Sequence, residues 1–214
     1  MLIFFVRHGL TDYNVQRRFQ GTLNIPLNAD GVFQAQTAAA RCRALKLERI
    51  YHSTLARAAE TAEIIAAASG APLIPAKGFN EVSLGAFQGL NHDEAKAQYP
   101  EAYANYFADR INAAPPDGES LYQVQQRALA ALAEIEQDAK DCERIAVVSH
   151  GALLKSLLSG IAGIPLEHFA RFDVSNGSIS VIESKNGVRR MITLNSMAHF
   201  GDPYAEMSKT KLLI

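Results

Sequence analysis

Two short segments of this chain share one design, LIFFVRHG at residues 2–9 and RIAVVSHG at residues 144–151. Each is an apolar run that ends near a histidine, and a glycine follows the histidine. Runs without polar alternation are typical of strands in a parallel sheet that helices cover on both faces. Because ligands bind at the carboxyl ends of such strands, the two segments predict that His8 and His150 meet in one crevice.

The rest of the chain alternates between strand-like and helix-like patterns. Arg49–Ser53 is a third short run, and helical periodicity marks Gly31–Leu45, Leu55–Ser69 and Glu119–Lys140. This alternation predicts an α/β fold, a three-layer α/β/α sandwich around a mostly parallel central sheet. A chain of 214 residues suits one domain, which we expect to span residues 1–214.

Two further features are expected on this sandwich. Ile179–Glu183 and Val188–Leu194 flank the pair Asn186-Gly187, a strong signal for a tight turn, and predict a β-hairpin at the sheet edge. The segment Asn91–Asp117 is mostly helical and ends in a loop rich in proline and glycine. We expect it to form a small helical cap, inserted at about residues 91–117.

Composition narrows the classes of function. The formal net charge is -1, so no overall field draws the molecule to nucleic acid or to an anionic membrane. No apolar run is long enough to cross a bilayer, and the apolar start is too short for a signal core, which favours a cytoplasmic protein without nucleic-acid or membrane partners. Cys42 and Cys142 lack metal-ligand spacing and are expected to be free thiols.

Two arginines are expected near the histidine crevice. Arg7 precedes His8, and Arg57 falls near the first turn of the helix that follows the strand at Arg49–Ser53. Helix N-termini and guanidinium groups both bind phosphate, because backbone N–H groups and a forked, permanently charged side chain face the anion. A lone histidine after a strand is more often structural. Two histidines with two arginines indicate a site for a phosphate dianion.

Four ordered blocks of sequence carry a resemblance to a known family. They are Arg7-His8-Gly9 with Thr11, Tyr13 and Asn14; Ser53, Leu55 and Arg57-Ala58 with Thr61-Ala62; Glu81 with Leu84-Gly85 and Phe87-Gln88-Gly89; and Val148-Ser149-His150-Gly151. Together with Gln20-Gly21, Pro26-Leu27, Gly31 and Gln34-Ala35, they resemble the motifs of the histidine phosphatase superfamily, which includes the cofactor-dependent phosphoglycerate mutases. Leu10, where the family often has Glu, and His52, where Ser or Thr is usual, depart from the pattern.

The resemblance implies a catalytic set. His8 would carry the phosphoryl group as nucleophile, while Arg7, Arg57 and His150 would bind the phosphate oxygens. Glu81 would give a proton to the leaving oxygen and later take one from water, which requires that its carboxyl group hold a proton in the working enzyme. No metal and no cofactor is expected, because guanidinium groups replace the cation of other phosphoryl-transfer enzymes.

The remaining candidates are expected to bind or to support. Phosphate or substrate binding is further expected of Asn14, Gln20, Gly21 and Gly151. The other histidines match no part of the motifs and are expected to be structural or surface residues: His52, His92, His168 and His199.

The expected function is hydrolysis of a small phosphorylated metabolite by a phosphomonoesterase through phosphohistidine. One alternative is a cofactor-dependent phosphoglycerate mutase, which is disfavoured because the region between Glu81 and Pro115 contains only Lys96 and Arg110 as strong bases. Another is a non-catalytic phosphate-binding protein, which the complete set of core residues disfavours. The sequence leaves the oligomeric state open, and the exposed edge hairpin offers one pairing surface for a homodimer.

Overall fold

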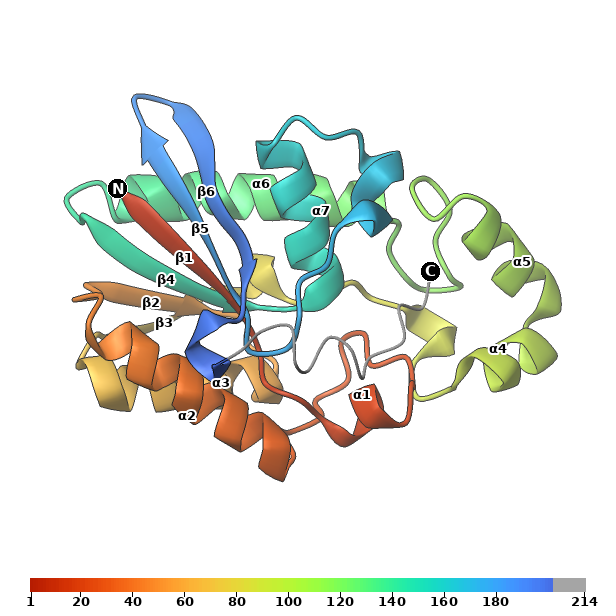
Figure 1. Cartoon of the computed structure of the whole chain (residues 1–214). Coiled ribbons are helices and arrows are strands. Elements are labelled where there is room, and N and C mark those ends of the chain that lie inside the picture. The colour runs from red at the N-terminus through yellow and green to blue at the C-terminus, as the bar shows by residue number, and fades with distance from the viewer. Residues whose placement is uncertain (202–214) are drawn as a thin grey trace.

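A six-stranded sheet forms the centre of the computed structural model, which describes residues 1–201 (Figure 1). The strands are β1 (Leu2–Arg7), β2 (Arg49–His52), β3 (Leu73–Pro75), β4 (Arg144–Ser149), β5 (Ile179–Lys185) and β6 (Val188–Ser196). Their order in the sheet is β3-β2-β4-β1-β5-β6. The first four strands are parallel, and the hairpin of β5 and β6 joins β1 in antiparallel orientation. The mostly parallel sheet with an edge hairpin is therefore confirmed.

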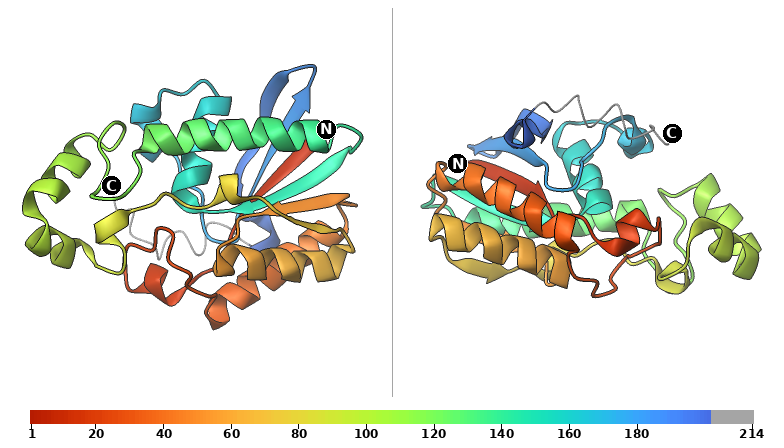
Figure 2. Two further views of the ribbon diagram at one scale, coloured as in Figure 1. Left: turned by 180° about the vertical axis from the view of Figure 1, so that it is seen from behind. Right: turned by 60° about the horizontal axis from the view of Figure 1, so that its bottom comes forward.

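Two helices cover each face of the sheet, so the three-layer sandwich is also confirmed. The helices are α2 (Ala29–Arg43) and α3 (Ala56–Ser69) on one face and α6 (Leu121–Asp138) and α7 (Gly151–Ile161) on the other (Figures 1 and 2). Ile3 and Phe5 of β1 pack in the core with α6 and α7, whereas Phe4 and Val6 pack in the core with α2 and α3. Burial on both faces is the physical reason that β1 is apolar at consecutive positions.

Strands β1 and β4 pair at the centre of the sheet. The register places Phe5 opposite Val147 and Arg7 opposite Ser149. Beyond the last pair, the backbone N–H of His8 donates to the carbonyl oxygen of Ser149 at 3.0 Å. The two chains therefore leave the sheet side by side at its carboxyl edge.

Two short helices, α4 (His92–Gln98) and α5 (Pro100–Ala108), lie beyond this edge, at the right of Figure 1. A capping box begins α4, since Asn91 accepts from the backbone of Glu94 and the Glu94 side chain accepts from the backbone of Asn91. Ala95 of α4 and Tyr106 of α5 form a small buried cluster with Phe87, which precedes α4. We refer to residues 91–108 as the α4–α5 segment, which lies where the sequence predicts a cap.

The structure also contains elements that the sequence patterns did not predict, among them the short helix α1 (Asp12–Val15), strand β3 and helix α7. Strand β3 is short and contains Pro75, which cannot donate to a ladder and suits only a sheet edge. Helix α7 was not predicted, although Leu153, Leu154, Leu157 and Leu158 recur at helical spacing and bury one face of it. Helices α2 and α6 begin two residues away from the predicted positions, because Asn28 and Ser120 are their N-caps.

Two predictions from composition can be compared with the structure. Cys42 and Cys142 are free thiols, as expected, and burial raises the pKa of Cys42 to about 11. Across residues 1–201, every helix is too short or too polar to span a membrane.

Candidate active site

A pocket of about 190 Å³ opens at the carboxyl edge of the sheet. Seven of the residues that the sequence predicts for the site line it: Arg7, His8, Asn14, Gln20, Gly21, Arg57 and Glu81. His150 lies directly behind, with its ring centroid 5.1 Å from that of His8. The structure thus brings together residues from four separate stretches of the chain.

The ring of His8 is fixed in one tautomer. Its Nδ1 lies 2.6 Å from the carbonyl oxygen of Gly9, which can only accept, so Nδ1 carries the hydrogen. Its Nε2 accepts a hydrogen bond of 3.2 Å from Nε of Arg57 and is therefore bare. Burial, with the positive charges of Arg57 and Arg7, holds the pKa of His8 well below its usual range. The ring of His8 is therefore neutral, and its Nε2 carries no hydrogen.

The hydrogen bonds of Ser53 fix the tautomer of His150. The Ser53 hydroxyl lies 2.9 Å from Oδ1 of Asn80, to which it can only donate. It therefore accepts from Nε2–H of His150 at 2.6 Å, and Nδ1 of His150 is left bare. This Nδ1 is buried and has no partner within residues 1–201. Burial and the charge of Arg57 hold the pKa of His150 well below its usual range.

A hydrogen bond from its guanidinium group holds Arg7 at the edge of the pocket. Nη1 donates to the carbonyl oxygen of Val174 at 2.6 Å, whereas the buried Nε has no partner among the described residues. A Cβ atom at Gly151 would lie 3.0 Å from the Arg7 guanidinium carbon, so glycine at this position leaves room for the arginine. Gly151 does not line the pocket itself, but its lack of a side chain makes room for the Arg7 guanidinium group.

Arg57 is fully buried and donates in three directions. Besides Nε, which reaches His8, its Nη1 donates to the carbonyl of Leu23 at 2.9 Å and its Nη2 to that of Gly21 at 2.8 Å. Burial lowers the pKa of Arg57 to about 10, so the group is still charged at neutral pH. Part of the guanidinium group is thus already hydrogen-bonded to the protein, and one hydrogen on each of Nη1 and Nη2 is left for a ligand.

The loop between β1 and α2 supplies the other predicted binding residues. Oδ1 of Asn14 accepts from the backbone N–H of Thr11 at 3.2 Å, which leaves its NH₂ group for a ligand. Oε1 of Gln20 accepts from the hydroxyl of Thr11 at 2.9 Å. Gly21 has φ of 50°, and a Cβ there would collide with the Gln88 side chain. Each residue therefore shapes the loop as well as lining the pocket.

Glu81 reaches the start of helix α7. Its carboxylate accepts from the backbone N–H groups of Ala152 at 3.2 Å and Leu153 at 3.0 Å, and from that of Val82 at 3.0 Å. Helix N-termini stabilise negative charge. Helix α7 therefore both presents His150, its N-cap residue, and holds the carboxylate of Glu81.

Two of the backbone donors at the N-terminus of α3 are already occupied by side chains. Thr54 N–H donates to Oδ1 of Asn80 at 2.8 Å, and Ala56 N–H donates to Oδ1 of Asn24 at 2.7 Å. The side-chain oxygens of two asparagines from other loops thus accept the hydrogen bonds that an anion would otherwise accept. The contribution of α3 to the pocket is the side chain of Arg57.

Five residues that were not predicted for the site also line the pocket: Arg18, Phe19, Val82, Leu84 and Ala152. Arg18 forms a 2.8 Å ion pair with Glu94 of the α4–α5 segment and donates to the carbonyl of Gly89. Phe19 packs 4.5 Å from His92, centroid to centroid. Arg18 and Phe19 follow the predicted Asn14 closely in sequence, which is the only signal that could have found them.

The other histidines do not line this pocket. His52 contacts the carbonyl of Ser53 through Nδ1, His168 pairs with Glu167, and His199 contacts the carbonyl of Gly177. Within residues 1–201, no group of histidine, cysteine or acidic side chains could hold a metal ion.

Comparisons with known proteins place the chain in a family. Residues 3–197 match the histidine phosphatase superfamily (branch 1). Phosphoglycerate mutase-like protein 4 of Arabidopsis thaliana is 41% identical over 158 residues, 72% of this chain and 68% of that protein. The structure of Bacillus stearothermophilus YhfR has a TM-score of 0.87 at 33% identity, over 92% of this chain and 98% of that one. The α-ribazole phosphatase of Shigella flexneri has a TM-score of 0.86 at 27% identity, over 92% and 96%.

These findings define the class of the molecule as an α/β enzyme with a paired-histidine pocket. The chain belongs to the histidine phosphatase superfamily.

The two buried histidines predict a loss of stability in acid. Both have a lowered pKa in the folded protein, so the unfolded chain binds protons that the folded protein does not. The free energy of unfolding should therefore fall by about 1.4 kcal/mol per pH unit for each histidine as the pH drops below about 6.5. Urea unfolding between neutral pH and about pH 5 measures this slope. His8→Gln and His150→Gln should each flatten it, and a wild-type slope in both variants would contradict the assignment.

The tautomer of His150 predicts proton uptake on phosphate binding. A dianion beside the bare Nδ1 favours the charged imidazolium. Calorimetric titration with inorganic phosphate, in buffers of different ionisation enthalpy, measures the uptake. Ser53→Ala removes the acceptor at Nε2, so neutral His150 can carry its hydrogen on Nδ1 and the uptake should decrease. Equal uptake in the two proteins is the contrary result.

Proposed function

We propose that this protein is a phosphomonoesterase that hydrolyses a small phosphorylated metabolite through a phosphohistidine on His8. The observation that carries the proposal is the hydrogen bonding of the His8 ring, with Nδ1–H on the Gly9 carbonyl and the bare Nε2 in the pocket beside Arg57. A neutral imidazole is a nucleophile, and guanidinium groups around it attract the anion that it attacks.

Two steps complete the reaction. First, Nε2 of His8 bonds to phosphorus as the bond from phosphorus to the alcohol oxygen breaks, and Glu81 gives that oxygen a proton. Then water attacks the phosphohistidine, Glu81 accepts a proton from the water, and the nitrogen–phosphorus bond breaks to release phosphate. Arg7 and His150 stabilise charge on the equatorial oxygens. Charge-assisted hydrogen bonds of this kind contribute about 1.5–3 kcal/mol each.

The nucleophile can be tested with an activated aryl phosphate. His8→Ala should lower the hydrolysis of p-nitrophenyl phosphate by about a thousandfold or more, because the covalent route is lost. Rapid acid-free quenching of the wild type should trap a phosphoenzyme that is labile in acid and stable in base, as a phosphoramidate is. The control is His168→Ala, outside the pocket, which should keep wild-type activity. Equal background in wild type and His8→Ala would instead indicate a non-catalytic phosphate-binding protein.

One observation favours a second candidate function, the phosphoglycerate mutase. Lys155 of α7 and Arg110 lie over the same ring, with Nζ 5.0 Å and Cζ 5.8 Å from the centroid of Phe169. Neither is in an ion pair with a carboxylate in residues 1–201. Burial lowers the pKa of Lys155, with Arg7 and Arg110 adding to this effect and Asp173 opposing it.

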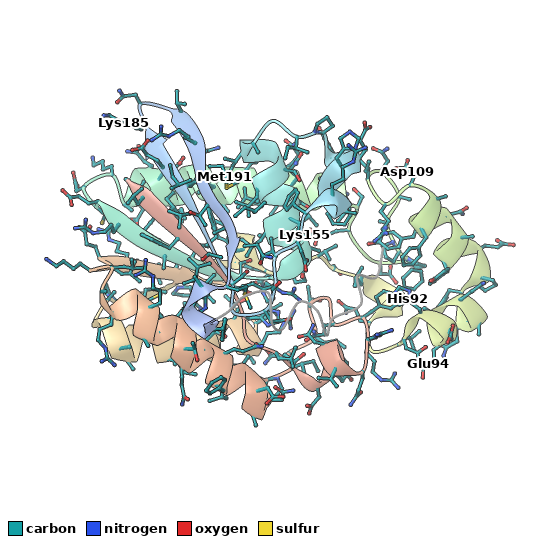
Figure 3. All side chains as sticks on the ribbon, viewed as in Figure 1. His92, Glu94, Asp109, Lys155, Lys185 and Met191 are labelled. Carbon is teal, nitrogen blue, oxygen red and sulfur yellow. The ribbon has the colours of Figure 1, made fainter. Side chains whose placement is uncertain are left out.

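The charge of Arg7 acts on Lys155, although neither Lys155 nor Arg110 lines the pocket that holds His8. Figure 3 shows Lys155 on α7 between the strands and the α4–α5 segment. Such a pair suits a second anionic group on the substrate, as in a phosphoglycerate. The sequence analysis did not count Lys155, because it lies far along the chain from the predicted cap.

The two functions differ in the fate of the phosphoryl group. We expect incubation with 3-phosphoglycerate to release free phosphate, with or without 2,3-bisphosphoglycerate, and to form no isomer. Phosphate release and isomerised product are measured separately, with His8→Ala as the blank. Isomerisation that depends on the bisphosphate would replace the phosphatase proposal by the mutase.

A further inference from the structure

Arg127 of helix α6 contacts the loop that carries Glu81. Its Nη1 donates to the carbonyl oxygens of Gly78 and Asn80, both at 2.9 Å, and its Nη2 lies 3.5 Å from the carbonyl oxygen of Glu81. One guanidinium group thus gathers three carbonyls of one short loop.

Glu119 holds the guanidinium and the far side of the same loop. Its carboxylate accepts from Nε and Nη2 of Arg127, both at 3.0 Å, which is the bidentate geometry that only arginine offers. The carboxylate also accepts from the backbone N–H of Ser83 at 2.9 Å, and the Glu119 N–H donates to the Ser83 carbonyl at 2.8 Å. The loop is therefore held on both sides of Glu81.

An exposed ion pair contributes little to stability, but this pair differs from one in two respects. The side chains are only 28% and 26% exposed, and most of the donors of Arg127 serve backbone carbonyls. Neither residue lines the pocket that holds His8, although both line a neighbouring pocket of about 390 Å³ that shares Glu81 with it. Because the Glu81 carboxylate is bound to the start of α7, Glu81 is fixed at its backbone by α6 and at its side chain by α7.

We propose that Glu119 and Arg127 are positioning residues for proton transfer, which hold the Glu81 carboxyl group within reach of the leaving oxygen. The inference rests on the proposed role of Glu81. Because neither residue lines the pocket that holds His8, we expect their loss to affect the step that needs a positioned proton.

The leaving group separates positioning from simple structural support. p-Nitrophenolate departs without a proton, whereas the alkoxide of β-glycerol phosphate needs one. The quantity kcat/KM covers binding and cleavage of the phosphorus–oxygen bond and excludes later hydrolysis of phosphohistidine. We expect Arg127→Lys, which keeps the charge without the fork, to lower kcat/KM for β-glycerol phosphate by about 10- to 100-fold. For p-nitrophenyl phosphate the loss should stay below about threefold.

A matched control pair joins the same helix to strand β6. Arg189 and Glu136 form a bidentate pair, 25% and 18% exposed, that joins β6 to α6 away from the pocket. Arg189→Lys should leave both kcat/KM values unchanged. Glu119→Gln, an isosteric change, provides a second variant if Arg127→Lys folds poorly, and it should show the same selective loss.

The outcomes distinguish this inference from the proposed function. Glu81→Gln should lose β-glycerol phosphate turnover selectively; if it does not, the proposed role of Glu81 fails, and the positioning role fails with it. If Glu81→Gln is selective while Arg127→Lys and Glu119→Gln impair both substrates equally, or neither, the positioning role alone is overturned.

Discussion

The parallel pairing of β1 with β4 is the constraint on which the rest of the site depends. It ends with the hydrogen bond from the His8 N–H to the Ser149 carbonyl, so two chain segments far apart in sequence turn away from the sheet at the same level. The ring of His8 and the ring of His150 then meet at 5.1 Å. Both helix layers bury their apolar faces against these two strands, and this packing fixes the register.

The pairing concentrates positive charge where water is excluded. Arg57 is fully buried among backbone carbonyls, and Arg7 lies beside it with an unpartnered Nε among the described residues. Buried cations without full compensation are costly. The same charges keep both histidines neutral, because they and the burial lower the pKa of each ring. The positive charges that are costly to bury by themselves are therefore suited to bind an anion, as a histidine phosphatase requires.

Much of this could be predicted from particular residues. The apolar runs that end at His8 and His150 predicted the central strands, and Asn186-Gly187 predicted the edge hairpin. Helix α7 was not predicted although its leucines recur at helical spacing. Two donors at the α3 N-terminus are occupied because Asn24 and Asn80 come from distant loops, which the sequence pattern could not indicate. A local sequence pattern cannot predict hydrogen-bond partners that come from distant parts of the chain.

The sequence by itself determined the layers, the strand ends and the kinds of side chain that gather there, because these follow from hydrophobic periodicity and from motifs a few residues long. The tertiary structure decided which nitrogen of each ring carries a hydrogen. His150 depends on the hydroxyl of Ser53, and the Glu81 loop depends on Arg127. Hydrogen bonds act over about 3 Å, so a proton's position is set by neighbours that only folding brings together.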